Sequence, residues 1–278
     1  MSTITVGKEN STSIDLYYED HGSGSPVVLI HGWPLSGDSW SGQVPALADA
    51  GYRVVTYDRR GFGASDKPGD ASTYDYDTLT GDLDAVLTGL DLREVTLVGF
   101  SMGGGEVARY LGTHGSDRVH SAVFAAAIPP CLKLDGDHPG GALDDDTVRG
   151  MQNGLEADPP GFLDGFTRNF FSADGALQVS EAQQQEALGL ALQADVHAAR
   201  ECIRSWTTDF RADLATITVP TLVIHGDSDA IVPIEKSGQL TAEQVAGSEL
   251  HVIEGGPHGI NASHAEEFNR ELLVFLQR

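Results

Sequence analysis

The sequence has few cysteines, few basic residues and no long hydrophobic run. Its two cysteines among 278 residues match neither a metal site nor a disulfide framework, so we expect Cys131 and Cys202 to be free thiols in a reducing compartment. No apolar run approaches the ~20 residues that span a bilayer, and the N-terminus lacks the basic and apolar segments of a signal peptide. We therefore expect a cytoplasmic protein that does not insert into membranes.

Basic residues are too scarce to form a surface for polyanions. The chain has 17 Lys and Arg residues against 41 Asp and Glu residues, which gives a formal net charge of −24 at pH 7. This balance argues against nucleic-acid partners and against docking on anionic membranes. We expect most of the acidic residues to form a solvated surface.

What the chain does contain is a regular alternation of short apolar runs and helical segments. Such alternation is typical of a parallel sheet wrapped by helices, and it predicts an α/β fold. The expected strands are residues 14–19, 27–30, 53–57, 95–98, 119–125, 221–224 and 249–253. The expected helices are residues 40–50, 76–90, 106–111, 236–245 and 264–276.

The alternation stops between residues 131 and 210, where no convincing strand occurs and residues 181–206 form the longest helical pattern. We expect a core of residues 1–130 and 211–278, with residues 131–210 inserted as a helical cap over the sheet. Several aromatic side chains of the insert could line a pocket from above, although we favour a role in the insert's own core. They are Phe162, Phe166, Phe170, Phe171 and Trp206.

Residues 99–103 read Gly-Phe-Ser-Met-Gly and lie between an expected strand and an expected helix. Gly-x-Ser-x-Gly in this context is typical of a nucleophile elbow, a sharp and strained turn that exposes the serine. The two glycines leave room where the strand and the helix crowd together. We therefore predict that Ser101 is a nucleophile, although the motif by itself also fits an ordinary glycine-rich turn.

A serine nucleophile needs a base, and the base needs an acid that orients it. Both follow later strands, in the order serine, acid, histidine that is expected for an elbow on an open α/β sheet. We predict His258 as the base because its loop follows the last strand, whereas His251 lies inside that strand. We prefer Asp229 as the acid, because Asp227 is placed to brace the turn.

Two backbone amides are placed to stabilise an oxyanion. They belong to Met102, directly after the nucleophile, and to Trp33, in the loop that follows the strand at residues 27–30. We expect His31 to be a buried histidine that braces this loop rather than a catalytic group.

Together these residues resemble the α/β-hydrolase superfamily, and within it the cofactor-free (non-haem) haloperoxidase, perhydrolase and arylesterase group. The similarity covers nearly the whole chain and is especially close to bacterial bromoperoxidases through the first hundred residues. It is carried by residues 31–34, 57–63, 99–106, 208–211, 225–229, 232–233 and 256–259. The resemblance implies an eight-stranded, mostly parallel sheet with a helical cap, and it supports Ser101, Asp229 and His258 as a triad. It also implies that no haem, metal or other cofactor is used, and that the protein forms homo-oligomers such as dimers or trimers.

In enzymes of this group the serine takes an acyl group from a small ester, amide or carboxylic acid. Water then releases the acyl group as an acid, whereas hydrogen peroxide releases it as a peracid that oxidises halide away from the protein. Pro34 follows Trp33, and proline restricts where the Trp33 carbonyl points. Either that carbonyl accepts a hydrogen bond from peroxide, which places Pro34 at the substrate pocket, or Pro34 only shapes the loop.

Two other functions stay open. One is a carboxylesterase or lactamase for which peroxide has no physiological role, and the elbow does not separate it from a perhydrolase. The other is a non-catalytic receptor that binds a small ligand beneath the cap, and an intact triad argues against it. Ser101 itself disfavours the related dehalogenases and epoxide hydrolases, because their nucleophile is an aspartate.

Overall fold

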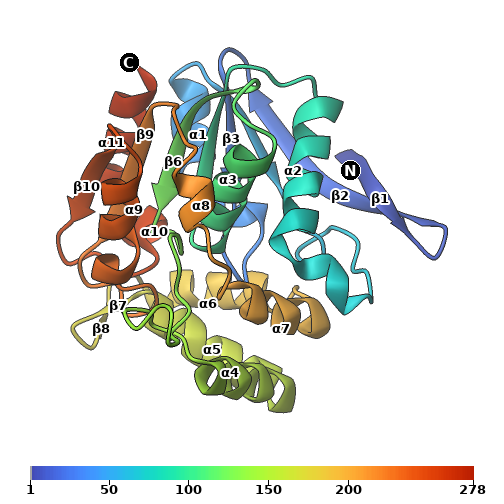
Figure 1. Ribbon diagram of the computed structural model, residues 1–278, viewed down its shortest axis with the longest axis vertical. Helices are drawn as coiled ribbons and strands as arrows, with labels where there is room; N and C mark the ends of the chain where they lie inside the picture. The colour runs from blue at the N-terminus through green and yellow to red at the C-terminus, as the bar shows by residue number, and fades with distance from the viewer. Residues whose placement is uncertain (1) are drawn as a thin grey trace.

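A computed structural model describes residues 2–278 and contains one eight-stranded sheet (Figure 1). Its strands are β1 (Ser2–Glu9), β2 (Thr12–Gly22), β3 (Pro26–Ile30), β4 (Arg53–Tyr57), β5 (Val95–Phe100), β6 (Val119–Ala125), β9 (Thr221–Gly226) and β10 (Glu249–Ile253). They lie in the order β1-β2-β4-β3-β5-β6-β9-β10. Strand β2 pairs antiparallel with β1 and β4, and the other neighbours are parallel. The predicted α/β class with a mostly parallel eight-stranded sheet is confirmed.

Helices cover both faces of this sheet, which explains why its central strands are continuous apolar runs. The helices of the sheet region are α1 (Val44–Asp49), α2 (Tyr76–Gly89), α3 (Met102–Thr113), α8 (Arg211–Leu214), α9 (Gly238–Gln244), α10 (Ile260–Ser263) and α11 (Ala265–Leu276). Helices α2, α3, α8 and α9 form one layer, and α1 packs with α11 on the opposite face (Figure 1). Every residue of β5 is buried between them.

The register of the parallel strands brings separate loops to one edge of the sheet. Ile30, the last residue of β3, pairs with Gly99 of β5, and Phe100 of β5 pairs with Ala125 of β6. Parallel strands run in the same direction, so the loops that follow their carboxyl ends meet at the same edge. The loop after β3 therefore lies beside the turn that contains Ser101.

The segment between β6 and β9 forms a separate helical layer at this edge, at the bottom of Figure 1. Its helices are α4 (Asp145–Ala157), α5 (Pro159–Phe170), α6 (Glu181–Ala191) and α7 (Val196–Ser205). The expected continuous pattern over residues 181–206 is two helices, because Asp195 accepts a hydrogen bond from the Ala198 amide and starts α7 anew.

Three local features differ from the sequence-based expectations. The insert holds a small hairpin, β7 (Ser172–Ala173) and β8 (Ala176–Leu177), whose strands are too short to show alternation. Strand β1 was not expected, because it is largely exposed and pairs on one side only, with β2. The helix expected from residue 40 begins at Val44, after a 3₁₀ turn over Gly37–Trp40.

No helix within residues 2–278 has the length and apolarity to cross a membrane.

Candidate active site

Ser101 occupies a strained turn between β5 and α3. Its backbone has φ 53° and ψ −116°, outside the ordinary regions for an L-residue with a side chain. A Cβ added at Gly99 would lie 2.4 Å from the Gly103 carbonyl oxygen, and one added at Gly103 would lie 2.5 Å from that of Ile30. The glycine spacing of the motif is therefore a steric requirement of the turn.

The three residues predicted as a triad form a hydrogen-bonded chain from Ser101 through His258 to Asp229. The Oγ of Ser101 is 2.9 Å from Nε2 of His258, and Nδ1 of His258 is 2.6 Å from Oδ2 of Asp229. All three side chains are buried. Because the carboxylate only accepts, Nδ1 carries a proton and Nε2 is left to accept from the Ser101 hydroxyl. This is the arrangement in which an imidazole takes a proton from a serine.

Asp229 is held by four donors. Its Oδ1 accepts from the amides of Ile231 at 2.9 Å and Val232 at 2.8 Å, and its Oδ2 lies 3.2 Å from Nε2 of His225 as well as beside His258. Burial by itself raises the pKa of Asp229, but the charge of His258 and the hydrogen bonds from His225 and His258 lower that pKa well below its usual range. The carboxylate therefore stays ionised at neutral pH.

The alternative residues lie elsewhere. Asp227 accepts a hydrogen bond from the Gly255 amide at 2.7 Å, so it ties together the loops after β9 and β10. His251 lies 2.9 Å from Glu267 on α11. Neither residue hydrogen-bonds to Ser101 or His258.

The two predicted oxyanion donors flank Ser101. Within residues 2–278, neither the Trp33 amide nor the Met102 amide has a hydrogen-bond acceptor. Met102 is the first residue of α3, where backbone N–H groups lack partners within the helix and favour negative charge. A Cβ added at Gly32 would lie 3.1 Å from the Ser101 Cβ, which shows how closely the Trp33 loop approaches the elbow.

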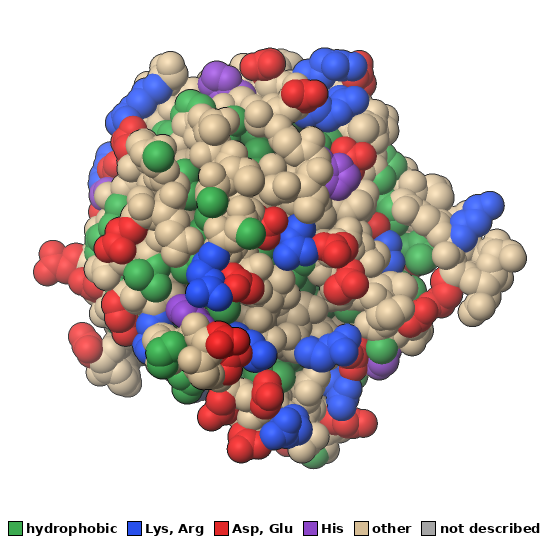
Figure 2. Space-filling view, viewed as in Figure 1, with side chains coloured by type: hydrophobic (Ala, Val, Ile, Leu, Met, Phe, Trp, Pro, Cys, Tyr) green, Lys and Arg blue, Asp and Glu red, His purple; other side chains and the backbone are tan. Residues whose placement is uncertain are grey.

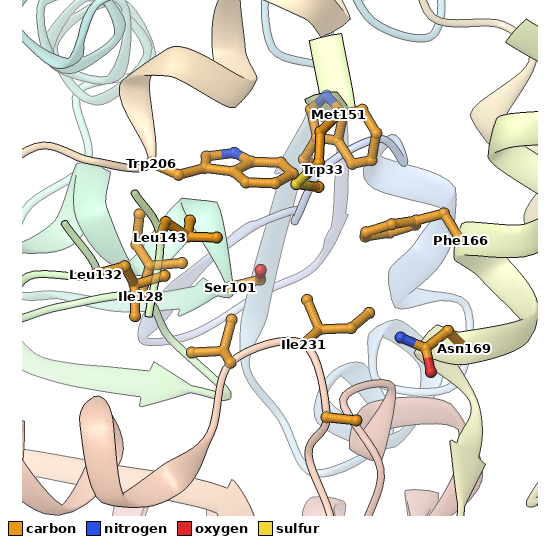
Figure 3. A pocket seen from close by; sticks show the side chains of 12 residues that line it. Trp33, Ser101, Ile128, Leu132, Leu143, Met151, Phe166, Asn169, Trp206 and Ile231 are labelled. Atoms are coloured by element: carbon orange, nitrogen blue, oxygen red, sulfur yellow. The ribbon is translucent and has the colours of Figure 1, made fainter. Parts of the chain in front are cut away.

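Ser101 lines a cavity of about 230 Å³ between the sheet and the helical layer (Figure 3). Apart from Ser101, the lining residues are Trp33, Ile128, Leu132, Leu143, Met151, Phe166, Asn169, Trp206, Ala230, Ile231 and Val232. The set is mostly apolar, and none of these residues carries a charge. Such a surface suits an uncharged, largely apolar acyl group.

Of the side chains considered for the pocket, Phe166 and Trp206 line this cavity. Four others do not line it: Pro34, Phe162, Phe170 and Phe171. Phe170 packs edge-on against the His258 ring, with centroids 5.0 Å apart. Phe162 lies edge-on to Trp33, with centroids 6.4 Å apart.

Phe162 and Phe170 therefore pack against site residues that lie outside the insert, in addition to any role in the insert's own core. Pro34 is buried in the loop that carries Trp33.

A buried polar network behind the oxyanion loop was not anticipated. The Arg59 side chain pairs with Glu106 of α3, with its Nε 2.7 Å from Oε1, and the Tyr57 hydroxyl donates to Oε2 of Glu106 at 2.7 Å. The Arg59 amide donates to Nε2 of His31 at 2.9 Å, and the Nδ1 of His31 lies 2.9 Å from the Gly32 carbonyl. This network connects the Trp33 loop to the helix that begins after Ser101.

His31 thus takes the bracing role expected of it, whereas Arg59, Glu106 and His225 were missed. One signal was present for each: Arg59 follows a strand at the active edge, Glu106 lies in the apolar face of α3, and His225 ends an apolar strand. The cavity residues Met151 and Asn169 gave no such signal, because their position depends on how the insert folds back.

Comparisons with known proteins identify the family to which the chain belongs. A family profile described as alpha/beta hydrolase fold matches residues 25–265. The chain therefore belongs to the α/β-hydrolase family. A crystal structure of bromoperoxidase from Bacillus anthracis matches with a TM-score of 0.96 and 53% identity, and covers 100% of this chain and 99% of that one.

Two sequence relatives place the chain within the family. A Synechocystis sp. protein, provisionally named a non-heme chloroperoxidase, is 49% identical over 100% of both chains. A bifunctional esterase/perhydrolase from Acinetobacter calcoaceticus is 35% identical over 95% of this chain and 96% of its own length. The chain is thus an enzyme of serine-hydrolase type, in the group of non-haem haloperoxidases, perhydrolases and esterases.

Proposed function

We propose that this protein is an acyl-transfer enzyme that forms an acyl-enzyme on Ser101 and releases it to water or to hydrogen peroxide. The observation that carries the proposal is the continuous hydrogen-bonded chain from Ser101 through His258 to Asp229. In this mechanism His258 takes the serine proton as the hydroxyl attacks the acyl carbon, and Asp229 stabilises the imidazolium that forms. The Trp33 and Met102 amides donate to the oxyanion.

Release of the acyl group reverses these roles. His258 first gives its proton to the leaving group, and it then takes a proton from the incoming water or peroxide. Attack by water yields a carboxylic acid, and attack by hydrogen peroxide yields a peracid. The peracid oxidises halide in solution, which accounts for haloperoxidase activity by an enzyme of this type. The mechanism requires no metal or haem.

The substrate side of the proposal rests on the cavity. We propose that residues 131–210 act as a cap domain over the core formed by residues 1–130 and 211–278. The proposal is supported by Met151 of α4, Phe166 of α5 and Trp206, directly after α7, which line the same cavity as Ser101. The uncharged lining favours small esters, amides or carboxylic acids with apolar acyl groups over substrates whose acyl group carries a charge.

The direct test is the release of p-nitrophenol from an activated ester. Wild-type protein should give a burst and then steady turnover, and Ser101→Ala should give neither. Ser228→Ala changes a serine outside the cavity and serves as the matched control, with activity near that of wild type. Absence of turnover by the wild type on a panel of esters, amides and acetate with peroxide would favour a non-catalytic receptor instead.

The choice between water and peroxide is a separate question, and we propose that Pro34 influences it through the direction of the Trp33 carbonyl. Pro34→Leu should lower the ratio of perhydrolysis to ester hydrolysis. An unchanged ratio would mean that Pro34 only shapes the loop. A wild-type enzyme that hydrolyses esters and makes no peracid would instead be a carboxylesterase or lactamase.

We also propose that the enzyme works in the cytoplasm as a homo-oligomer, a dimer or a trimer. Buried free thiols at Cys131 and Cys202 support a reducing compartment. Light scattering after size-exclusion chromatography measures the assembly, and a mass equal to that of one chain at micromolar concentration would contradict the oligomer.

A further inference from the structure

Met151 is a reactive side chain in the cavity that the acyl-transfer mechanism does not use. It belongs to α4, is half-buried, and lines the same cavity as Ser101. Figure 3 shows Met151 and Trp33 on the side of the cavity toward which the Ser101 hydroxyl points. The Met151 thioether is therefore exposed to the products that leave the acyl-enzyme at Ser101.

The other methionine in the described chain is in a different environment. Met102 directly follows Ser101, yet its side chain is fully buried and does not belong to the cavity wall. Met102 is therefore adjacent to Ser101 in sequence but does not line the cavity, whereas Met151 is distant in sequence and does line it. This separation provides an internal comparison for any reagent that is produced at Ser101.

Resting on the perhydrolase activity proposed above, we propose that Met151 is a modification site, oxidised by the peracid that the enzyme itself makes. A lone pair of the sulfur attacks the distal peracid oxygen, an S–O bond forms, and the O–O bond breaks. The peracid proton ends on the departing carboxylate. The thioether is oxidised to a sulfoxide, and the peracid is reduced to its carboxylic acid.

The product of this reaction changes the cavity. A sulfoxide oxygen is polar, and the wall residues Leu143 and Phe166 have no side-chain group that can hydrogen-bond to it. Oxidation therefore makes the cavity a poorer site for apolar acyl groups. The enzyme consequently loses activity as it turns over peroxide, and the loss follows the amount of peracid made rather than the time of exposure to peroxide.

Peptide mass spectrometry tests the site directly. Cleavage after Arg and Lys yields peptide 150–168, with Met151 as its one methionine, and peptide 94–109, with Met102 as its one methionine. Enzyme is incubated with acetate and hydrogen peroxide, in the presence of excess free methionine that destroys peracid in solution. We expect peptide 150–168 of the wild type to gain one oxygen, and peptide 94–109 to remain unchanged.

Ser101→Ala in the same mixture is the control for peroxide itself, and its peptide 150–168 should stay unoxidised. Equal oxidation in both proteins, or protection of wild-type Met151 by free methionine, would overturn the inference. A parallel reaction without free methionine measures peracid through oxidation of an added thioether. Peracid production without Met151 oxidation rejects this inference alone, whereas absence of peracid rejects the perhydrolase activity on which it rests.

Met151→Leu tests the consequence, since leucine has a similar volume and no oxidisable sulfur. Each protein is scored by the fraction of its own initial ester-hydrolysis rate that remains after increasing amounts of peracid have been made. The wild type should lose most of its rate while Met151→Leu retains most of it. Equal losses in the two proteins would show that inactivation does not pass through Met151.

Discussion

At the scale of single residues, the predicted triad is a set of buried polar side chains that are hydrogen-bonded to one another. Asp229 shows this most clearly, because its two oxygens face two amides and two imidazoles. Buried polar groups are costly unless they are hydrogen-bonded, so these partners fix the side chain as well as its charge.

Asp229→Asn should lower kcat by roughly 10⁴-fold, since the loss of the carboxylate leaves His258 in the wrong tautomer. It should also change how stability depends on pH. The folded-state pKa of Asp229 lies below the unfolded value, so its stabilisation is present above about pH 4 and is lost as pH falls through the folded pKa.

Urea unfolding of wild type and Asp229→Asn over a series of pH values measures this contribution. The difference in free energy of unfolding should be largest at neutral pH and should shrink below about pH 4. A difference that grows on acidification would contradict the ionised carboxylate.

His225 is a positioning residue for Asp229. Its Nε2 lies 2.9 Å from the Val232 carbonyl and 3.2 Å from Asp229, so this nitrogen donates, while its Nδ1 has no partner within residues 2–278. A hydrogen bond to a charged group contributes about 1.5–3 kcal/mol. We expect His225→Leu to lower kcat about tenfold or more with little change in KM, because His225 does not line the cavity.

His225→Gln keeps an N–H donor in the side chain and should recover much of the lost kcat. Steady-state kinetics with one ester on the three proteins makes the comparison. Equal kcat for His225→Gln and His225→Leu would indicate that His225 only fills space.

At the scale of elements, the site depends on how α3 is joined to the loop after β3. The Arg59–Glu106 ion pair is fully buried and joins α3 to the loop after β4, with Tyr57 completing the hydrogen bonds of Glu106. Arg59 also donates hydrogen bonds to His31 in the loop after β3. Removal of one member of a buried pair leaves an uncompensated charge. Loss of either member should therefore destabilise the fold around α3.

Glu106→Ala should lower the free energy of unfolding by about 3–5 kcal/mol, measured by urea denaturation. Glu235→Ala, at an exposed position, is the control and should change it by less than about 0.5 kcal/mol. A loss below about 1 kcal/mol for Glu106→Ala would mean that the pair contributes little to holding α3 in place.

The strands and helices differ in how well the sequence predicts them. Strands β3 to β6 were predicted closely because they are buried on both faces and read as continuous apolar runs. The triad was predicted because Ser101 and Asp229 follow such strands and His258 follows the last strand, β10. Strand β1 and the break between α6 and α7 were missed because local pairing and capping decide them. The Arg59–Glu106 pair and the cavity wall were missed because they join residues that are far apart in the chain.

At the scale of the whole molecule, the dominant property is the net charge of −24. Figure 2 shows Asp and Glu side chains spread over the visible face and interspersed with Lys and Arg, which fits a solvated acidic surface. Like charges repel one another in the folded state, and this repulsion is screened by salt.

Raising the salt concentration from about 0.01 M to about 0.15 M should therefore raise Tm by a few degrees, because the screening length falls from roughly 30 Å to roughly 8 Å. Differential scanning calorimetry measures the shift, and an equal osmolality of glycine serves as the uncharged control. A fall in Tm with salt would show that surface ion pairs outweigh the net repulsion.

The central claim is that Ser101 carries the acyl group during turnover. Rapid acid quenching of the enzyme with an activated acetyl ester, followed by mass spectrometry of peptide 94–109, tests this claim most directly. The account predicts that this peptide gains one acetyl group at Ser101 within the first turnover, and that His258→Ala and Ser101→Ala do not accumulate it. Steady ester turnover with peptide 94–109 unmodified at every time point, or with the acetyl group on another residue, would contradict the account.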